Sequence, residues 1–144
     1  MIHHDLDRAY ETALSRGEVL FVRHGNNKSG ADRLASCWVY KQHSIGNYDV
    51  IEDPIDADWE RDCNQQCNHA PRYRRNGDRY CPVAGNLRNQ AMIDKGGIDE
   101  VHAYPLPGGT GTGDCVRRAV RAGLVVTNHG YPRVTMEDML RETH

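Results

Sequence analysis

Four short apolar runs alternate with segments of helical apolar spacing, and this alternation limits the possible folds more than any other feature. The runs are "EVLFV" (18–22), "YDVIEDPI" (48–55), "EVHAYPL" (100–106) and "LVVTNHG" (124–130). Strands that alternate with helices are typical of βαβ units, whose strands form a mostly parallel sheet. The sequence therefore predicts an α/β fold.

Helices are expected between and after these runs, where apolar residues recur every three or four positions. They are a first helix that ends near Gly17, a second over about Gly30 to His43, a third in "GNLRNQAMIDKG" (85–96), a fourth after the glycines at 108–113 and a terminal one in "TMEDMLRETH" (135–144), capped by Thr135. This spacing predicts that Leu87 and Val120 point inward and that Cys37 and Cys115 are core residues. The run 124–130 is predicted to be a buried strand.

Length and composition favour one ordinary domain. The chain has 144 residues, of which 38% are hydrophobic, so it can bury a core of its own. A net charge of −2 excludes a polycation built for nucleic acid. The sequence has neither a secretory signal pattern nor an apolar run of membrane-span length, so a cytoplasmic protein is expected. In that setting, five cysteines favour metal binding or burial over disulfides.

Two glycine-rich segments, "HGNNKSGAD" (24–32) and "PLPGGTGTGD" (105–114), follow predicted strands and precede predicted helices. Each either forms a plain turn or presents backbone N–H groups to a phosphate at the positive end of the next helix. Ligands of parallel sheets bind at the carboxyl ends of the strands, which both segments share. Their common position favours phosphate binding, while Asp32 and Asp114 are also suited to capping the helices.

Four motifs in this order, "HGNNKSGADRLA", "DADWE", "AGNLRNQAM" and "PLPGGTGTGD", resemble the YspA-like branch of the SLOG superfamily, which is related to the LOG enzymes and to the core of DprA. The resemblance covers about residues 18–130 and implies a Rossmann-like three-layer fold with a mostly parallel sheet. It also implies binding of a nucleotide or of a nucleotide-derived, ADP-ribose-like ligand. The related LOG enzymes hydrolyse nucleoside 5′-monophosphates to base and ribose 5-phosphate.

The resemblance assigns roles to individual residues. It implies that "PGGTGT" is the phosphate loop and that Arg88 reaches into the same pocket, although a solvated helix arginine is the alternative. The implied ligand-binding residues are Gly25, Gly30, Asp32, Arg88, Asn89, Gly108, Gly109, Thr110, Gly111, Thr112 and Asp114.

Two departures from the family pattern matter. Cys115 stands where the LOG enzymes have a catalytic glutamate, and a thiol cannot stabilise an oxocarbenium-like transition state as a carboxylate does. Ligand binding without reaction is therefore favoured, and an N-glycoside hydrolase acting on nucleotides is the alternative. Family members also begin with a strand and a "GxR"-type loop, whereas this chain begins inside the following helix. Either the sheet lacks its usual first strand or the start as given omits it.

The segment "RDCNQQCNHAPRYRRNGDRYCPV" (61–83) has no periodicity and reads as an insert. Cys63, Cys67, His69 and Cys81 give it the pattern C-x3-C-x-H-x11-C, which predicts a structural Cys3His zinc site. The alternatives are a loose insertion with incidental cysteines and a Cys63–Cys67 disulfide.

The insert is also rich in arginine, with two tyrosines interleaved. The residues are Arg61, Arg72, Arg74, Arg75 and Arg79, with Tyr73 and Tyr80. Such a pattern suits single-stranded nucleic acid bound as in DprA, or a polyphosphate, but a solvated surface is the ordinary explanation. The favoured partner remains a phosphorylated nucleoside or ADP-ribose-like compound, with a homo-oligomer left open.

Overall fold

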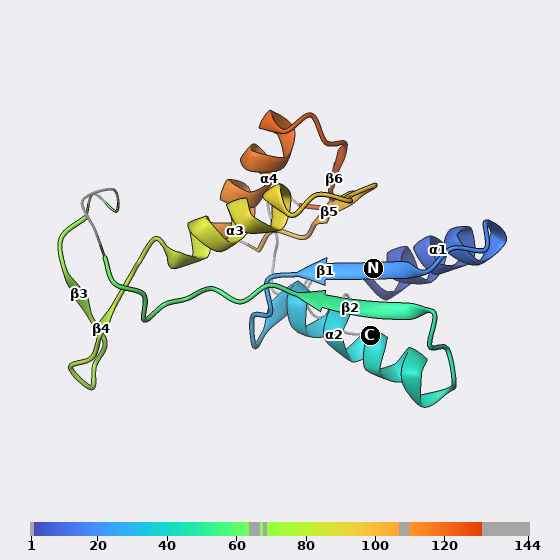
Figure 1. Ribbon diagram of the computed structural model, residues 1–144, viewed down its shortest axis with the longest axis horizontal. Coiled ribbons are helices and arrows are strands. Elements are labelled where there is room, and N and C mark those ends of the chain that lie inside the picture. The colour runs from blue at the N-terminus through green and yellow to red at the C-terminus, as the bar shows by residue number, and fades with distance from the viewer. Residues whose placement is uncertain (1, 64–66, 68, 107–109, 131–144) are drawn as a thin grey trace.

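Figure 1 shows the computed structural model of the chain, which describes residues 2–63, 67, 69–106 and 110–130. In chain order the elements are α1 (Ile2–Ser15), β1 (Leu20–His24), α2 (Gly30–Ser44), β2 (Val50–Pro54), β3 (Arg72–Tyr73), β4 (Arg79–Tyr80), α3 (Ala84–Asp94), β5 (Val101–Ala103), α4 (Gly111–Arg121) and β6 (Val126–Asn128). Helices alternate with parallel strands, which confirms the α/β class. The predicted terminal helix at 135–144, including Thr135, lies outside the described residues.

The parallel strands form two pairs. β1 pairs with β2 from Leu20 opposite Val50 to His24 opposite Pro54, and β5 pairs with β6. The β1 strand was predicted to end at residue 22 but continues to His24. Its last two side chains are polar, yet both find partners on β2: Arg23 Nε donates to Asp53 Oδ2 at 2.8 Å, and His24 contacts Glu52.

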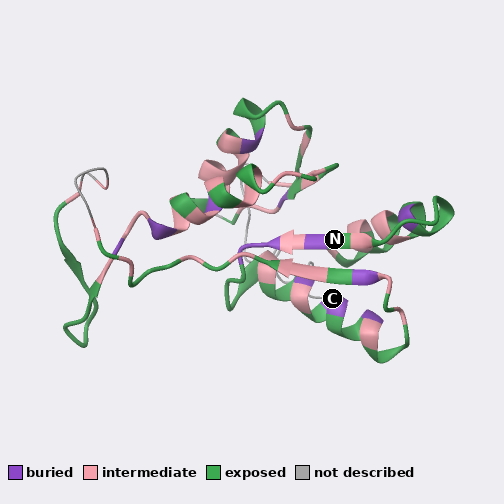
Figure 2. Ribbon diagram, viewed as in Figure 1, coloured by how far each residue is buried: buried purple, intermediate pink, exposed green. Residues whose placement is uncertain are grey.

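The core lies between α2 and the β1–β2 pair, where Figure 2 shows most of the buried segments. Its buried members are Val22, Ala35, Trp38, Val39 and Val50, and Ile2, Leu6, Tyr10 and Leu20 pack against them. Trp38 is only 2% exposed and its indole N–H donates to Asp7 of α1. The amphipathic face predicted for α1 therefore serves to close this core. Within the described ranges, no helix combines the length and apolar character that a membrane span requires.

Several predictions of burial are wrong. Cys37 is exposed, because α2 buries the face that carries Ala35, Trp38 and Val39, and Cys37 points away from it. In α3 the contact with α4 buries Asn89, at 3% exposure, rather than Leu87. In α4 the buried residue is Ala119, and Val120 is exposed.

The last run is also not a buried strand. Its regular part, β6, has three residues, and Val125 beside it is 80% exposed. The physical reason is its position: in the described part of the chain β6 pairs with β5 on one side, and α4 is the helix with the main packing contact to the pair.

One arginine joins the β1–β2 pair to α3. Besides Asp53, Arg23 donates to the backbone carbonyls of Met92 and Gly96 at the end of α3, at 2.9 and 2.7 Å. Hydrogen bonds from Lys95 and Arg23 lower the pKa of Asp53, so its carboxylate stays charged. The contacts of Arg23 therefore set the position of α3 relative to the ends of β1 and β2.

The insert contains a small hairpin, β3–β4, which projects from the rest of the fold (Figure 1). Its turn is closed by a hydrogen bond from Arg74 N to Asp78 O, at 2.8 Å, and Gly77 adopts a φ of 90°. The dipeptide Asn76–Gly77 is a strong signal for such a turn, and reading the segment as wholly irregular overlooked it.

Candidate functional site

The loop that follows β1 is held in place by a buried histidine. His24 Nδ1 accepts a hydrogen bond from the backbone N–H of Asn26 at 2.9 Å. Its Nε2 must therefore carry the proton, which is donated to Glu52 Oε1 at 2.7 Å. Asn26 takes a left-handed φ of 54°, and its side chain donates to Asp56 at 2.7 Å. These contacts fix the loop beside the segment after β2.

Arg88 of α3 reaches across to this loop. Its Nη1 donates to the carbonyl oxygen of Gly25, and its Nε donates to Asn89 Oδ1 at 2.9 Å. A Cβ added at Gly25 would lie 2.6 Å from Nη1 of Arg88. Glycine therefore allows the guanidinium to lie directly on the backbone, and any side chain at this position would displace it. The alternative interpretation of Arg88 as a solvated helix arginine does not describe this contact.

A pocket of about 280 Å³ opens at the carboxyl ends of β1 and β2. It is lined by Gly25, Asn26, Asn27, Lys28, Asp56, Ala57, Trp59 and Arg88. Two cationic side chains and one indole thus line the same small pocket. Trp59 is 38% exposed, and its ring packs against Gly85 at the start of α3.

The second glycine-rich loop is joined to α3 through the residue next to Arg88. The buried amide of Asn89 donates to Gly111 O at 3.2 Å and to Asp114 Oδ2 at 3.1 Å. Arg118 donates to the same oxygen at 2.8 Å. Although burial opposes it, these two hydrogen bonds lower the pKa of Asp114. Successive residues of α3 therefore contact both loops.

Other predicted ligand residues have different positions. Gly30 begins α2 with a φ of 71°, and Asp32 accepts the backbone N–H of Asn27 at 3.2 Å, so both shape the first loop without lining the pocket. Thr110 is the residue before α4, and Gly111 and Thr112 form its first turn. Gly108 and Gly109 lie outside the described residues.

The half-buried thiol of Cys115 lies on α4 close to these groups. Burial raises its pKa, and the positive charge of Arg88 acts in the opposite direction. Because the net pKa is raised, the thiol is neutral at neutral pH and does not supply the negative charge of a glutamate.

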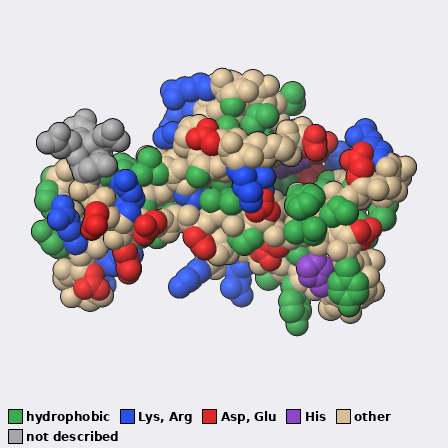
Figure 3. Space-filling model, viewed as in Figure 1, with side chains coloured by type: hydrophobic (Ala, Val, Ile, Leu, Met, Phe, Trp, Pro, Cys, Tyr) green, Lys and Arg blue, Asp and Glu red, His purple; other side chains and the backbone are tan. Residues whose placement is uncertain are grey.

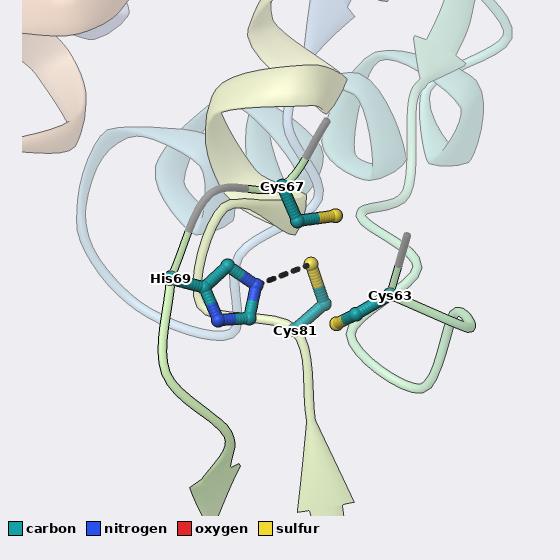
Figure 4. Close-up of side chains that lie close together, drawn as sticks. All are labelled: Cys63, Cys67, His69 and Cys81. Carbon is teal, nitrogen blue, oxygen red and sulfur yellow. Dashed lines mark hydrogen bonds between the residues drawn. The ribbon is translucent and has the colours of Figure 1, made fainter. Parts of the chain in front are cut away.

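The predicted metal ligands come together in the insert (Figure 4). Figure 4 shows Cys63, Cys67, His69 and Cys81 directed toward one another, and their ligand atoms all lie within 4.8 Å. A tetrahedral zinc ion with Zn–S bonds of 2.3 Å separates its sulfur ligands by about 3.8 Å. This Cys3His cluster could therefore hold a metal ion such as zinc. In this structure Cys63 is not part of a disulfide.

An arginine of the insert donates to two sulfur atoms of the cluster. Arg61 Nη1 donates to Cys67 Sγ at 2.8 Å and to Cys81 Sγ at 3.5 Å. Burial, followed by the hydrogen bond and charge of Cys81, raises the pKa of Cys63. Burial also opposes ionisation of Cys81, but the hydrogen bonds from Arg61, from the Val83 backbone and from the two neighbouring thiols together lower its pKa. Thiolate is the form that binds metal.

The cluster also supports the pocket. The backbone N–H of Cys81 donates to the carbonyl oxygen of Trp59 at 2.7 Å, and Cys81 O accepts the N–H of Ala84 at 3.2 Å. Cys81 is fully buried. One metal ligand thus positions both the indole of the pocket and the start of the helix that carries Arg88.

Sequence reasoning missed several pocket residues. Lys28 and Trp59 belong to the quoted motifs "HGNNKSGADRLA" and "DADWE", but neither was given a role. A signal was available, because the "DADWE" segment directly follows the predicted second strand and so falls at the same edge of the sheet as the first loop.

The contact between Gly25 and Arg88 can be tested by adding one methyl group. Gly25→Ala is compatible with the backbone, which is not left-handed there, but its Cβ displaces the guanidinium. We expect roughly tenfold weaker binding of an anionic ligand, since a charged hydrogen bond contributes about 1.5–3 kcal/mol. Calorimetric titration measures the affinity, and thermal unfolding shows that the fold persists. As a control, Arg121→Met changes an exposed arginine at the last position of α4, away from the pocket, and should bind normally. Equal affinities of Gly25→Ala and the wild type would contradict the assignment.

Fold and site together define an α/β protein with a pocket at the carboxyl ends of two parallel strands and a Cys3His cluster in an inserted segment. Over 111 residues the chain is 33% identical to the "Gene 61 protein" of Mycobacterium phage D29, a match that covers 77% of this chain and 72% of that protein. The chain therefore belongs to the same family as this phage protein, whose name states no activity. No family model and no solved structure matches the chain.

Proposed function

We propose that the protein is a YspA-like member of the SLOG superfamily and binds a nucleotide or a nucleotide-derived, ADP-ribose-like ligand. The observation that carries the proposal is the pocket, which combines Lys28, Arg88 and the indole of Trp59 at the carboxyl ends of two parallel strands. Ligands of open parallel sheets bind at this edge. In the proposed cytoplasmic setting, phosphorylated nucleosides are the partners expected.

The charges of the pocket suit a phosphate. Its lining carries two cationic side chains, Lys28 and Arg88, against one acid, Asp56, whose carboxylate accepts a hydrogen bond from Asn26, so positive charge is in excess. An arginine fork and a lysine together match the charge of a phosphate group. The indole of Trp59 provides a flat face for a base, and stacking of this kind is worth about 1–3 kcal/mol.

The start of α4 offers a second point of contact for phosphate. The first N–H groups of a helix have no partner within it and carry the positive end of the helix dipole. Asn89 fixes this helix start by its hydrogen bonds to Gly111 and Asp114. Its neighbour in the chain, Arg88, lines the pocket. A ligand with phosphate at one end and a base at the other would use both loops.

The proposal is tested by fluorescence titration with ADP-ribose and AMP. The chain has two tryptophans, of which Trp38 is buried in the core and Trp59 lines the pocket. Saturable quenching is expected in the wild type and should disappear in Trp59→Phe. A single-stranded oligonucleotide serves as the competing ligand of the DNA-binding alternative. Quenching that survives in Trp59→Phe, or binding to the oligonucleotide alone, would contradict the proposal.

LOG-type hydrolysis is the alternative, and we expect little or no release of base from AMP. The reason is that Cys115, with its raised pKa, is a neutral thiol. Chromatography of AMP incubated with the protein measures release directly. Cys115→Glu should bring a measurable rate if the carboxylate is the only missing group. Fast release by the wild type would show that another acid, such as Asp114, carries out the reaction.

We further propose that the Cys3His cluster holds one structural zinc ion. Three thiolates and one imidazole would close the site to water and leave a net charge of −1, which the guanidinium of Arg61 offsets. The hairpin supports this role, since its strands have two residues each and most of their side chains are exposed. Metal coordination would supply the order that packing does not.

A further inference from the structure

A second cluster of metal-ligand side chains joins the two ends of the described chain. It consists of Asp5 in the first turns of α1, His102 in β5 and His129 directly after β6, and their ligand atoms lie within 4.8 Å of one another. No motif of the sequence marks these residues, because they come together only through the fold. Neither the ligand pocket nor the Cys3His cluster includes any of them.

The distances within this cluster match a metal site. His102 Nδ1 lies 3.0 Å from His129 Nε2, and His129 Nε2 lies 3.5 Å from Asp5 Oδ2. Ligand atoms bound at 2.0–2.1 Å to a tetrahedral zinc ion are about 3.3 Å apart. The two observed separations lie on either side of this value.

The number of protons available to these three side chains also favours a metal site. His102 Nε2 faces Glu100 at 3.1 Å, so in the neutral ring Nε2 carries the proton and Nδ1 keeps a lone pair. That lone pair and Asp5 Oδ2 then both face the single proton on His129 Nε2. A metal ion in place of this proton would accept a lone pair from each of the three atoms.

Neighbouring groups hold these side chains as they do around metal ligands. Glu100 holds the far nitrogen of His102, and the Tyr104 hydroxyl donates to Asp5 Oδ2 at 2.6 Å. Tyr104 also stacks on His129, with ring centroids 4.6 Å apart. Carboxylate and hydroxyl partners of this kind orient metal ligands and fix the tautomer of a ligating histidine.

We propose that Asp5, His102 and His129 bind one divalent transition-metal ion of the zinc type. Two imidazoles and one carboxylate suit zinc, and three protein ligands leave a coordination position for water. Asp5 and His129 are mostly buried, while 31% of the His102 side chain is exposed, so an ion enters from the side of His102. Arg8 occupies the other oxygen of Asp5, at 3.3 Å.

The test is metal content after equilibrium dialysis against zinc under reducing conditions. The wild type is expected to hold one zinc more per chain than His102→Ala or His129→Ala. The test compares zinc contents and looks for a difference of one ion per chain. This difference is the same whether or not the Cys3His cluster also holds an ion. His4→Ala is the matched control, because His4 is an exposed histidine beside Asp5 on α1 and should leave the metal content unchanged.

A conservative variant distinguishes the loss of a metal ligand from a folding defect. Asp5→Asn keeps an oxygen for the Tyr104 hydroxyl but removes the ligand charge, so it should lose most of its affinity for the second zinc while its circular dichroism stays that of the wild type. The wild type should also show a melting temperature that rises with zinc concentration, and Asp5→Asn a smaller rise. Equal zinc content in the wild type, His102→Ala and Asp5→Asn would overturn the proposal.

Discussion

Replacing Arg88 with methionine is expected to weaken the binding of ADP-ribose or AMP by on the order of 100-fold. The substitution removes a charged group that lines the pocket and contacts the backbone of Gly25. Hydrogen bonds to charged groups contribute about 1.5–3 kcal/mol each, which corresponds to about 10- to 150-fold in affinity. Methionine keeps a long apolar stem, so the fold should persist. Calorimetric titration gives the affinity of both proteins.

Arg121→Met is the matched control for this prediction. Arg121 is an exposed arginine at the last position of α4, so its replacement makes the same change in net charge away from the pocket. It should change affinity little, and any change should vanish at higher salt, as for surface charges. If Arg88→Met bound as tightly as Arg121→Met, the pocket would not be the phosphate site.

Replacing Cys81 with serine is expected to prevent binding of the proposed zinc ion and to disorder the insert. Cys81 is the fully buried ligand of the cluster, and its thiol takes part in hydrogen bonds with Arg61 and His69. In protein purified without chelator, the zinc content of this cluster should fall from one ion per chain to almost none, as metal analysis will measure. Limited proteolysis should then cut the insert, because local order depends on the metal.

The same variant should lose ligand affinity. Cys81 holds the backbone of Trp59 and the first turn of α3, so the indole is no longer fixed beside Arg88 once the metal is lost. We expect roughly tenfold weaker binding, in line with the value of one stacking contact. Cys37→Ser is the control, since this exposed thiol lies on α2 outside the cluster. A Cys81→Ser protein with normal zinc content and an uncut insert would contradict the prediction.

Patterns that act locally along the chain predicted the helices and parallel strands of the described residues, although the β3–β4 hairpin was overlooked. Apolar runs and helical spacing gave the α/β class, and α2 was placed within one residue of its observed end at Ser44. The spacing of cysteines and histidine likewise predicted which four side chains share one cluster. In each case the information lies in neighbouring residues, since secondary structure and short ligand motifs depend on them.

Properties that depend on packing between distant elements could not be predicted from local sequence patterns. Asn89 is polar, so a hydrophobic pattern assigns it to the surface, yet its amide is buried because Gly111 and Asp114 supply partners. Val125 is exposed beside β6, which pairs with β5 alone among the strands of the described residues. The triad of Asp5, His102 and His129 spans nearly the whole chain and has no local signal at all.

The hairpin β3–β4 projects away from the helices and sheets (Figure 1), and its surface carries acidic and basic side chains side by side (Figure 3). Its tip can therefore lengthen or shorten in related phage proteins without moving the pocket. The stretch from Cys81 to Asn89 has no such freedom, because a backbone hydrogen bond closes the turn from Cys81 to Ala84 and each residue gained or lost within α3 would rotate the residues after it by 100°. Arg88 and Asn89 would then face the wrong loops. Among relatives, tolerance to insertions should change abruptly at the last cysteine of the insert.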